Sequence, residues 1–330
     1  MKMLRIVIVC ILVVGLLALA SFAEEKTYTL RFNTVGKPPQ PSTHALDTFA
    51  NLVEKLSTGK IKVNIFHSGQ LGDQKTSILS VMRGDLDMTF GGASWFASLV
   101  PYPKVGIFTA AYAFRDLDHM YKIMTGPIGK EYWDDIREKA GIRVLDVWYN
   151  GTRELNVIKK VGPVHTPEDM KGVKLRMPNV PLYLDMGRIL GAEPTPLGYG
   201  EIYLALKTGL IEGQDNPLPN DDALKVYEVT HYIVLTDHLI GHLCPIINEA
   251  LWQSMPEEYR VYIKKALIAA RYHCNYLVLK QEAELLGKFK EHGMEVVIPN
   301  KEAFMERAVE IYKKYEDEWG GMYEKIQNMR

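Results

Sequence analysis

The first third of the chain alternates short extended segments with amphipathic helical segments. Residues 28–35 and 61–65 alternate apolar and polar side chains, and residues 86–90 form a third short strand-like segment. Between these segments, residues 45–56 and 78–82 place apolar side chains at helical spacing. This β-α-β-α-β order predicts a parallel sheet whose strands are joined by helical crossovers.

Capping residues stand at the ends of the two predicted helices. Ser42 or Thr43 is expected to cap the first helix, and Asp73 the second, because their side-chain oxygens can accept a backbone N–H. Gly59 and Gly84 are expected to end the helices, because glycine tolerates the left-handed conformation that follows a last turn.

Length and charge limit the class of protein. A chain of 330 residues can form two modest domains. Its formal net charge is −1, which argues against nucleic acid or an anionic membrane surface as the main partner. After residues 1–23, no stretch of the sequence is long and apolar enough to suggest a membrane span.

The leader itself, residues 1–23, has the organisation of a secretory signal peptide. Lys2 and Arg5 precede an apolar run at 6–20, and small residues near Ala23 suit a cleavage site. The run is short for a bilayer span, so we favour cleavage over a retained anchor. The mature protein is therefore predicted to be exported.

Three cysteines occur in the chain. Cys10 lies inside the apolar run of the leader, not at its end, which argues against a lipoprotein anchor. Cys244 and Cys274 remain in the mature chain, where an oxidising compartment would permit a disulfide. Two buried free thiols are favoured over that disulfide, and no Cys-x-x-Cys spacing indicates zinc.

A short strand carries the main candidate binding residue. Val173 and Leu175 alternate with Lys174 and Arg176, and Pro178 ends the strand because it lacks an N–H. Arg176 therefore lies at the carboxyl end of a strand, where open α/β sheets bind ligands. Its planar guanidinium matches a carboxylate with two parallel hydrogen bonds. The alternative is a surface arginine in an ordinary salt bridge, which strand context alone favours.

The loop at residues 91–96 follows the third predicted strand at the same sheet edge. It lacks the lysine of a P-loop and the spacing of a dinucleotide-binding motif, so a phosphate cradle is not expected. We interpret it as a pocket wall, in which Gly92 allows close approach of backbone to a ligand and Trp95 offers a flat apolar face. An equally good interpretation makes Trp95 a core residue.

Four segments together resemble the TRAP-transporter periplasmic solute-binding proteins of the DctP type. They are residues 166–178, 191–196, 200–209 and 212–217. Their order and spacing match that family, and the resemblance covers nearly all of the mature chain. It implies an α/β, two-domain periplasmic binding protein of the Venus-flytrap kind. A ligand cleft would lie between the domains, and a long helix would span both.

The resemblance also suggests where the chain crosses between domains. Domain I is expected to comprise residues 24–150 plus 239–278, and domain II residues 151–238 plus 279–330. Gly151 would give the backbone freedom to hinge. The long helix is expected to begin near residue 255 and to run through Leu286. A second helix is predicted from about 301 to 327.

Further ligand contacts are implied by the same resemblance. It implies that Arg153 lies near the ligand as a second cation and that Asn216 contacts the ligand, although each would otherwise be an ordinary loop or turn residue. Asn216 has both an amide donor and an acceptor, so it can bind a carboxylate or a hydroxyl. Tyr199 follows an extended segment and is expected to face the cleft, where Tyr199 and either Trp148 or Phe96 would pack against the rest of the ligand.

The pocket wall bears on the kind of ligand. Sialate-binding members of the family carry an acidic and a basic residue where this chain has Gly92 and Trp95. This difference argues against a heavily hydroxylated sugar acid and suggests a smaller or more apolar carboxylate.

Two functions are compared, a binding receptor and an exported enzyme that acts on a small organic acid. An enzyme needs a nucleophile or an acid/base pair, and the sequence has no Gly-x-Ser-x-Gly elbow or metal triad. His238 and His242 are four residues apart, but their segment is predicted to be extended, so no metal site is expected. The sequence predicts a periplasmic receptor without a cofactor, which delivers a carboxylate to TRAP membrane subunits.

Overall fold

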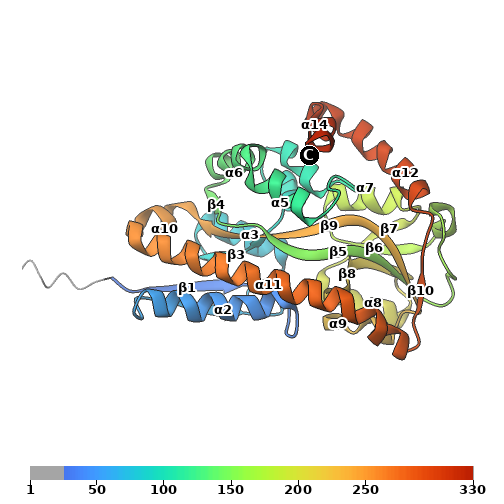
Figure 1. Cartoon of the computed structure of the whole chain (residues 1–330), viewed down its shortest axis with the longest axis horizontal. Coiled ribbons are helices and arrows are strands. Elements are labelled where there is room, and N and C mark those ends of the chain that lie inside the picture. The colour runs from blue at the N-terminus through green and yellow to red at the C-terminus, as the bar shows by residue number, and fades with distance from the viewer. Residues whose placement is uncertain (1–25, 330) are drawn as a thin grey trace, which may run out of the picture.

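The computed structural model describes residues 26–329, so the predicted signal peptide at 1–23 and Cys10 lie outside the described residues. One mixed sheet forms the centre of the molecule (Figure 1). Its strands are β1 (Tyr28–Asn33), β2 (Ile61–Phe66), β3 (Met88–Gly91), β4 (Ile142–Val144), β5 (Trp148–Val157), β6 (Lys174–Met177), β7 (Glu193–Pro196), β8 (Gly213–Pro217), β9 (Tyr232–Asn248) and β10 (Glu295–Val297). The strand order is β2-β1-β3-β9-β5-β8-β6-β7, and β4 and β10 also pair with β9.

Helices surround this sheet. The α-helices are α2 (Pro41–Leu56), α3 (Gln74–Arg83), α4 (Ala93–Leu99), α5 (Leu117–Thr125), α6 (Pro127–Ala140), α7 (Pro181–Ile189), α8 (Ile202–Thr208), α9 (Leu218–Leu224), α10 (Glu249–Ser254), α11 (Glu257–Glu291), α12 (Lys301–Lys314), α13 (Glu316–Trp319) and α14 (Met322–Asn328). Short 3-10 helices are η2 (Pro103–Thr109), η3 (Pro167–Met170), η4 (Tyr199–Glu201) and η5 (Val226–Glu228). Within residues 26–329, no helix combines the length and the apolar character that a bilayer crossing would require.

The predicted β-α-β-α-β unit is confirmed. Strand β1 lies between β2 and β3 and pairs in parallel with both, and α2 and α3 are the crossovers. Asp73 caps α3 as expected, because its side chain accepts the Thr76 N–H. The expected cap at Ser42 or Thr43 is wrong. Helix α2 already begins at Pro41, whose fixed φ and missing N–H suit a first helical position.

Two long antiparallel strands, β5 and β9, run through the middle of the sheet and connect its two halves. Arg153 lies in β5 and not in a loop, and the extended segment predicted around His238 and His242 is part of the single strand β9. Gly151 interrupts the β5–β9 register with φ at 106°. A Cβ at this position would lie 2.6 Å from the Cβ of Pro217. Only glycine fits this crossing without strain.

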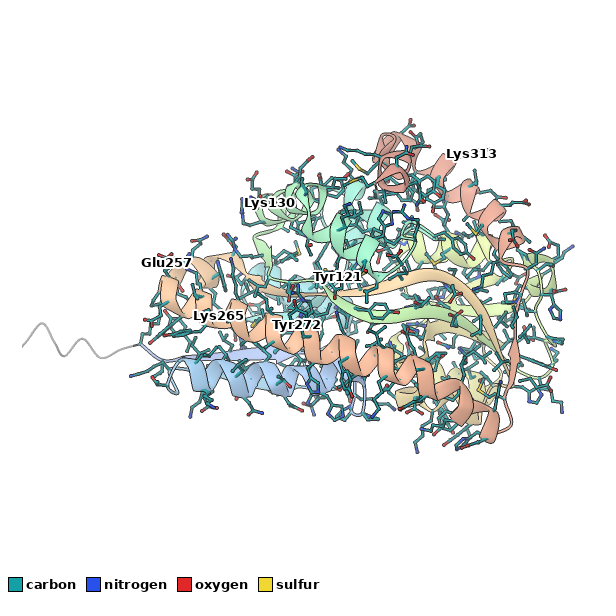
Figure 2. The ribbon with its side chains drawn as sticks, viewed as in Figure 1. Tyr121, Lys130, Glu257, Lys265, Tyr272 and Lys313 are labelled. Carbon is teal, nitrogen blue, oxygen red and sulfur yellow. The ribbon has the colours of Figure 1, made fainter. Side chains whose placement is uncertain are left out.

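The predicted long helix is α11, which extends along both halves of the sheet and packs on α2 and α9 (Figure 1). At 35 residues it is about 52 Å long. The second predicted helix, at 301–327, is instead divided into α12, α13 and α14. The breaks fall at Tyr315 and at Gly320 and Gly321, both of which have positive φ. Side chains on the outer face of α11, such as Tyr272, point to solvent (Figure 2).

Apolar side chains fill both halves beneath the helices. Trp148 has no exposed surface and packs edge-on against Phe90, with ring centroids 5.3 Å apart. Cys244 and Cys274 are buried free thiols, as predicted, and burial raises the pKa of both. Neither thiol is therefore suited to act as a thiolate nucleophile.

Candidate functional site

A cavity of about 900 Å³ lies where the strands of both halves of the sheet end. The segments that follow β1 and β3 form one wall, and residues of β6, η4 and β8 form the opposite wall. Among the predicted site residues, those that line the cavity are Gly92, Trp95, Arg153, Arg176, Tyr199 and Asn216. Segments that are distant in sequence thus meet at one sheet edge, as expected for an α/β binding site.

Arg176 lies in this cavity as a buried cation that has no carboxylate partner among the residues that the structure describes. It is the third residue of β6, and only 3% of its surface is exposed. Its Nε donates to the carbonyl oxygen of Leu197 at 2.9 Å, and within residues 26–329 its two other guanidinium nitrogens have no hydrogen-bond partner. Burial lowers the pKa of Arg176 to about 10, so it stays protonated at neutral pH. A buried charge of this kind favours an incoming anion.

Arg153 is also buried, but its charge is already paired. Its Nε and Nη2 donate to the two carboxylate oxygens of Asp215 at 2.6 and 2.8 Å. His238 Nε2 also contacts Asp215, at 3.1 Å. Burial alone would raise the pKa of Asp215, but Arg153 and His238 hold it below its ordinary value. Arg153 therefore belongs to a buried ion pair in β5 and β8, not to a solvated loop.

Asn216 lies inside β8 and is held by a chain of amide hydrogen bonds. Its Nδ2 donates to Gln214 Oε1 at 2.5 Å, and Gln214 Nε2 donates to Asp221 Oδ1 at 2.8 Å. Asn156 Nδ2 donates to the other oxygen of Asp221 at 2.7 Å. Burial raises the pKa of Asp221, while these two amides and the Arg153 charge act in the opposite direction.

The cavity walls are partly aromatic. Trp95, in α4, and Tyr199, in η4, are both partly buried and line the cavity. Gly92 precedes α4 in an extended conformation that any residue can adopt. A Cβ there would lie 3.9 Å from the indole of Trp95. The predicted ligand contact through Trp148 is contradicted, because this side chain lies in the hydrophobic core and does not line the cavity.

Several cavity residues have no counterpart among the sequence predictions. Gln40 Nε2 donates to Asn220 Oδ1 at 2.8 Å, a bond that links the start of α2 to α9 across the cavity. Tyr183, in α7, stacks on Arg153 with the guanidinium carbon 5.2 Å from the ring centroid. Prolines stand close to both Gln40 and Asn220 in the sequence, and such prolines indicate a change in chain direction.

His238 and His242, the two histidines that are four residues apart, have separate partners. His238 contacts Asp215 and Thr236, whereas Nε2 of His242 accepts the backbone N–H of Ala93 at 3.2 Å. Within residues 26–329, no group of three or more His, Cys, Asp or Glu side chains is arranged to hold a metal ion.

His242 should make the protein less stable in acid. Burial lowers its pKa from 6.5 to about 4, so between these values the unfolded chain binds a proton that the folded chain does not. The free energy of unfolding should therefore fall as the pH is lowered from about 6.5 to about 4. Since the ring is only partly buried, we expect a loss of about 1–3 kcal/mol.

Urea denaturation of the wild type and of His242→Gln between about pH 7.5 and about pH 4.5 measures this contribution. The variant should lose less stability than the wild type over this range. Parallel pH profiles for the two proteins would contradict the assignment to His242.

Comparison with known proteins identifies the family to which the chain belongs. The model of the bacterial extracellular solute-binding protein family 7, DctP, matches residues 32–318. The chain is 34% identical over 271 residues to the sialic acid-binding periplasmic protein SiaP of Vibrio cholerae, which covers 82% of this chain and 83% of that protein. It is 29% identical over 297 residues to the 2,3-diketo-L-gulonate-binding periplasmic protein YiaO of Escherichia coli, which covers 89% and 88%.

Solved structures agree with the sequence relatives. A TRAP periplasmic solute binding protein from Roseobacter denitrificans with bound 3-deoxy-D-manno-oct-2-ulosonic acid has a TM-score of 0.86 at 31% identity and covers 91% of this chain and 99% of its own. A protein of the same class from Sulfurospirillum deleyianum, with bound succinate, has a TM-score of 0.85 at 26% identity, covering 92% and 100%. The predicted two-domain α/β binding-protein fold is confirmed, and the chain belongs to the bacterial extracellular solute-binding protein family 7, DctP.

Proposed function

We propose that this protein is the extracytoplasmic receptor of a TRAP transporter and that it captures an organic acid by its carboxylate. The observation that carries this proposal is Arg176, a buried guanidinium that lines the cavity and has no carboxylate partner among the described residues. A bound carboxylate would supply the missing counter-charge and accept two parallel hydrogen bonds. The names of related proteins, which include sialic acid and succinate binders, support an acidic ligand.

Capture would proceed in two steps. A carboxylate first replaces the water around Arg176, and Asn216 adds a hydrogen bond. Arg153 is held in place by Asp215 and presents its stacked face toward the cavity wall at Tyr183. The two domains, residues 24–150 plus 239–278 and 151–238 plus 279–330, then close around the ligand. Closure excludes water, and the lower dielectric strengthens the charged contacts.

Gly151 is the proposed hinge residue. It lies at the register break between β5 and β9, the strands that connect the two halves of the sheet. Its positive φ marks a backbone position that other residues adopt only with strain. The protein is expected to be periplasmic, and its closed form is the state that we expect the TRAP membrane subunits to recognise.

We infer that the protein binds its ligand without converting it. The pairing most typical of an acid/base catalyst, His238 with Asp215, is fully buried and also engages Arg153, so it is used in a structural ion pair. An isotope-labelled acid should be recovered unchanged after incubation with the protein. Conversion at catalytic rates would favour the alternative, an exported enzyme that acts on a small organic acid.

Two measurements identify the ligand. Native mass spectrometry of the purified protein reveals any acid that is retained from the host. A thermal-shift screen of monocarboxylates, hydroxy acids, 2-oxo acids, dicarboxylates and aromatic acids detects binding directly. A ligand at a hundredfold excess over its Kd adds about 2.7 kcal/mol of stability, which is readily measured. The absence of stabilisation by every acid class would contradict the proposed function.

Trp95→Ala should alter ligand preference. The indole lines the cavity, and its loss removes apolar contact area. We expect affinity for an aromatic or branched aliphatic acid to fall roughly tenfold, and affinity for a small hydroxy acid to change much less. Calorimetry with one acid of each kind measures the difference. Tyr272→Ala, on the exposed face of α11, is the matched control (Figure 2). Equal losses for both acids would show that Trp95 is only structural.

A further inference from the structure

A fully buried carboxylate lies one layer behind the cavity and is not used in the binding scheme above. Asp221, in α9, has no exposed surface. Both of its oxygens accept side-chain amide N–H groups, from Asn156 at 2.7 Å and from Gln214 at 2.8 Å. Gln214 in turn contacts Asn216, which lines the cavity. Asp221 thus reaches the binding site through one intervening side chain.

We propose that Asp221 is a positioning residue that determines which edge of the Asn216 amide faces the ligand. Oδ1 of Asp221 accepts a hydrogen bond from Nε2 of Gln214, so Gln214 turns its amide nitrogen toward Asp221. The Gln214 oxygen then faces Asn216, and Asn216 must donate its own nitrogen to that oxygen. Both amide orientations therefore follow from the acceptor oxygen that one buried side chain presents to Gln214.

The reverse direction of the chain is unfavourable as long as Oδ1 of Asp221 carries no proton. If Gln214 were reversed, its oxygen would face an Asp221 oxygen, and two acceptors would be in contact at hydrogen-bond distance. If the Asn156 amide turned over, its Oδ1, which is buried without a partner among residues 26–329, could accept a proton on Oδ2 of Asp221. Oδ1 of Asp221 would still be an acceptor for Gln214, so the chain would keep its direction.

The consequence is an exposed acceptor in the cavity. Within residues 26–329, no donor contacts Oδ1 of Asn216, while its Nδ2 is bonded to Gln214. Arg176 pairs with Gln214 in the β6–β8 register, so the free oxygen and the free guanidinium belong to neighbouring strands. A ligand that matches both carries a carboxylate and, close to it, a hydroxyl that donates to Asn216.

The inference therefore narrows the ligand class within the proposed function, on which it depends. A hydroxy acid should bind more tightly than the 2-oxo acid with the same carbon skeleton. The oxo acid can still pair with Arg176 and with the second N–H of Asn216. It leaves Oδ1 without a donor, and an unsatisfied polar group in a closed site is unfavourable.

The test compares matched acids in the wild type and in Asp221→Asn. The probes are lactate with pyruvate, 2-hydroxyisocaproate with 2-oxoisocaproate, and phenyllactate with phenylpyruvate, measured by calorimetry. For the wild type we expect the hydroxy acid of a bound pair to have a Kd lower by about tenfold. The new amide of Asp221→Asn can donate to Gln214, which allows the chain to reverse and to present the Asn216 nitrogen. The ratio of the two Kd values should then fall close to one.

Two further variants make the result specific. Asp222→Asn changes the adjacent carboxylate, which pairs with Lys288 at 2.5 Å, and it should keep the wild-type ratio. Gln214→Met removes the intervening amide and should lower the ratio as Asp221→Asn does, which provides the test if Asp221→Asn does not fold. An equal loss of affinity for both acids of a pair, or an unchanged ratio in Asp221→Asn and Gln214→Met, would overturn the inference.

The outcome also separates this inference from the proposed function. If the wild type binds other acids but none of the three hydroxy acids, or prefers the 2-oxo acid, the role of Asp221 is contradicted and carboxylate capture by Arg176 stands. If the wild type binds no organic acid of any class, both are contradicted.

Discussion

Arg176→Ala should weaken binding of the carboxylate ligand by about 2–5 kcal/mol, which is more than any other single change in the cavity. In the variant, the bound carboxylate is desolvated and has lost its cationic partner. Its remaining neighbours are the neutral amide of Asn216 and Arg153, whose charge is already paired with Asp215. Isothermal calorimetry with the ligand identified by the screen measures the loss.

Arg176→Lys should also bind weakly, because an ammonium group keeps the charge but cannot reproduce the planar two-pronged contact. It would also lose the Nε bond that fixes the side chain on Leu197. Near wild-type affinity in either variant would contradict the role of Arg176.

The stability of the empty protein separates binding from folding in this experiment. A buried cation without a counter-charge is unfavourable, so Arg176→Met should not lower the free energy of unfolding of the ligand-free protein. A large destabilisation in urea would instead show that Arg176 is a structural residue.

Unlike Arg176→Met, Arg153→Leu should lower the free energy of unfolding of the ligand-free protein, by about 3–5 kcal/mol. The side chain of Asp215 has no exposed surface, and without Arg153 its one remaining side-chain partner among the described residues would be His238. A buried carboxylate without compensation is strongly unfavourable. Urea denaturation at neutral pH, without ligand, measures the effect.

Two controls test whether the loss of the buried ion pair causes this destabilisation. Arg83→Leu breaks an exposed ion pair, in which Arg83 and Asp85 are 2.8 Å apart, and should cost less than about 1 kcal/mol. The double variant Arg153→Leu with Asp215→Leu removes both buried charges and should recover much of the lost stability. A loss in Arg153→Leu no larger than that in Arg83→Leu would show that the buried pair does not stabilise the fold.

For Arg176 and Arg153, the position in the chain could be predicted from the sequence better than the contacts of the side chain. Arg176 was placed at a strand end from alternation and from Pro178, and the structure has it near the end of β6. Its partners were not predictable, because they depend on which distant segments reach the same edge. Arg153 was expected in a loop, but it is in β5, where the pairing with β8 brings it to Asp215.

Trp148 shows the same limit for an aromatic residue. Trp148 is expected from the sequence to contact the ligand, yet it lies in the core against Phe90. The direction of a strand side chain depends on which face of the sheet is covered, and local sequence does not specify this. By contrast, the cap at Asp73 was predicted correctly, because it depends only on residues within one helical turn.

The unit β1-α2-β2-α3-β3, the long helix α11 and the family could be predicted from the sequence, because periodicity, turn residues and spaced motifs are local or linear properties. The fold pairs Arg153 with Asp215, leaves Arg176 without a carboxylate partner among residues 26–329, and links Asp221 to Asn216 through Gln214, none of which could be predicted from the sequence. Charge compensation and amide direction depend on which side chains meet in space, and here those contacts join residues from separate strands and helices.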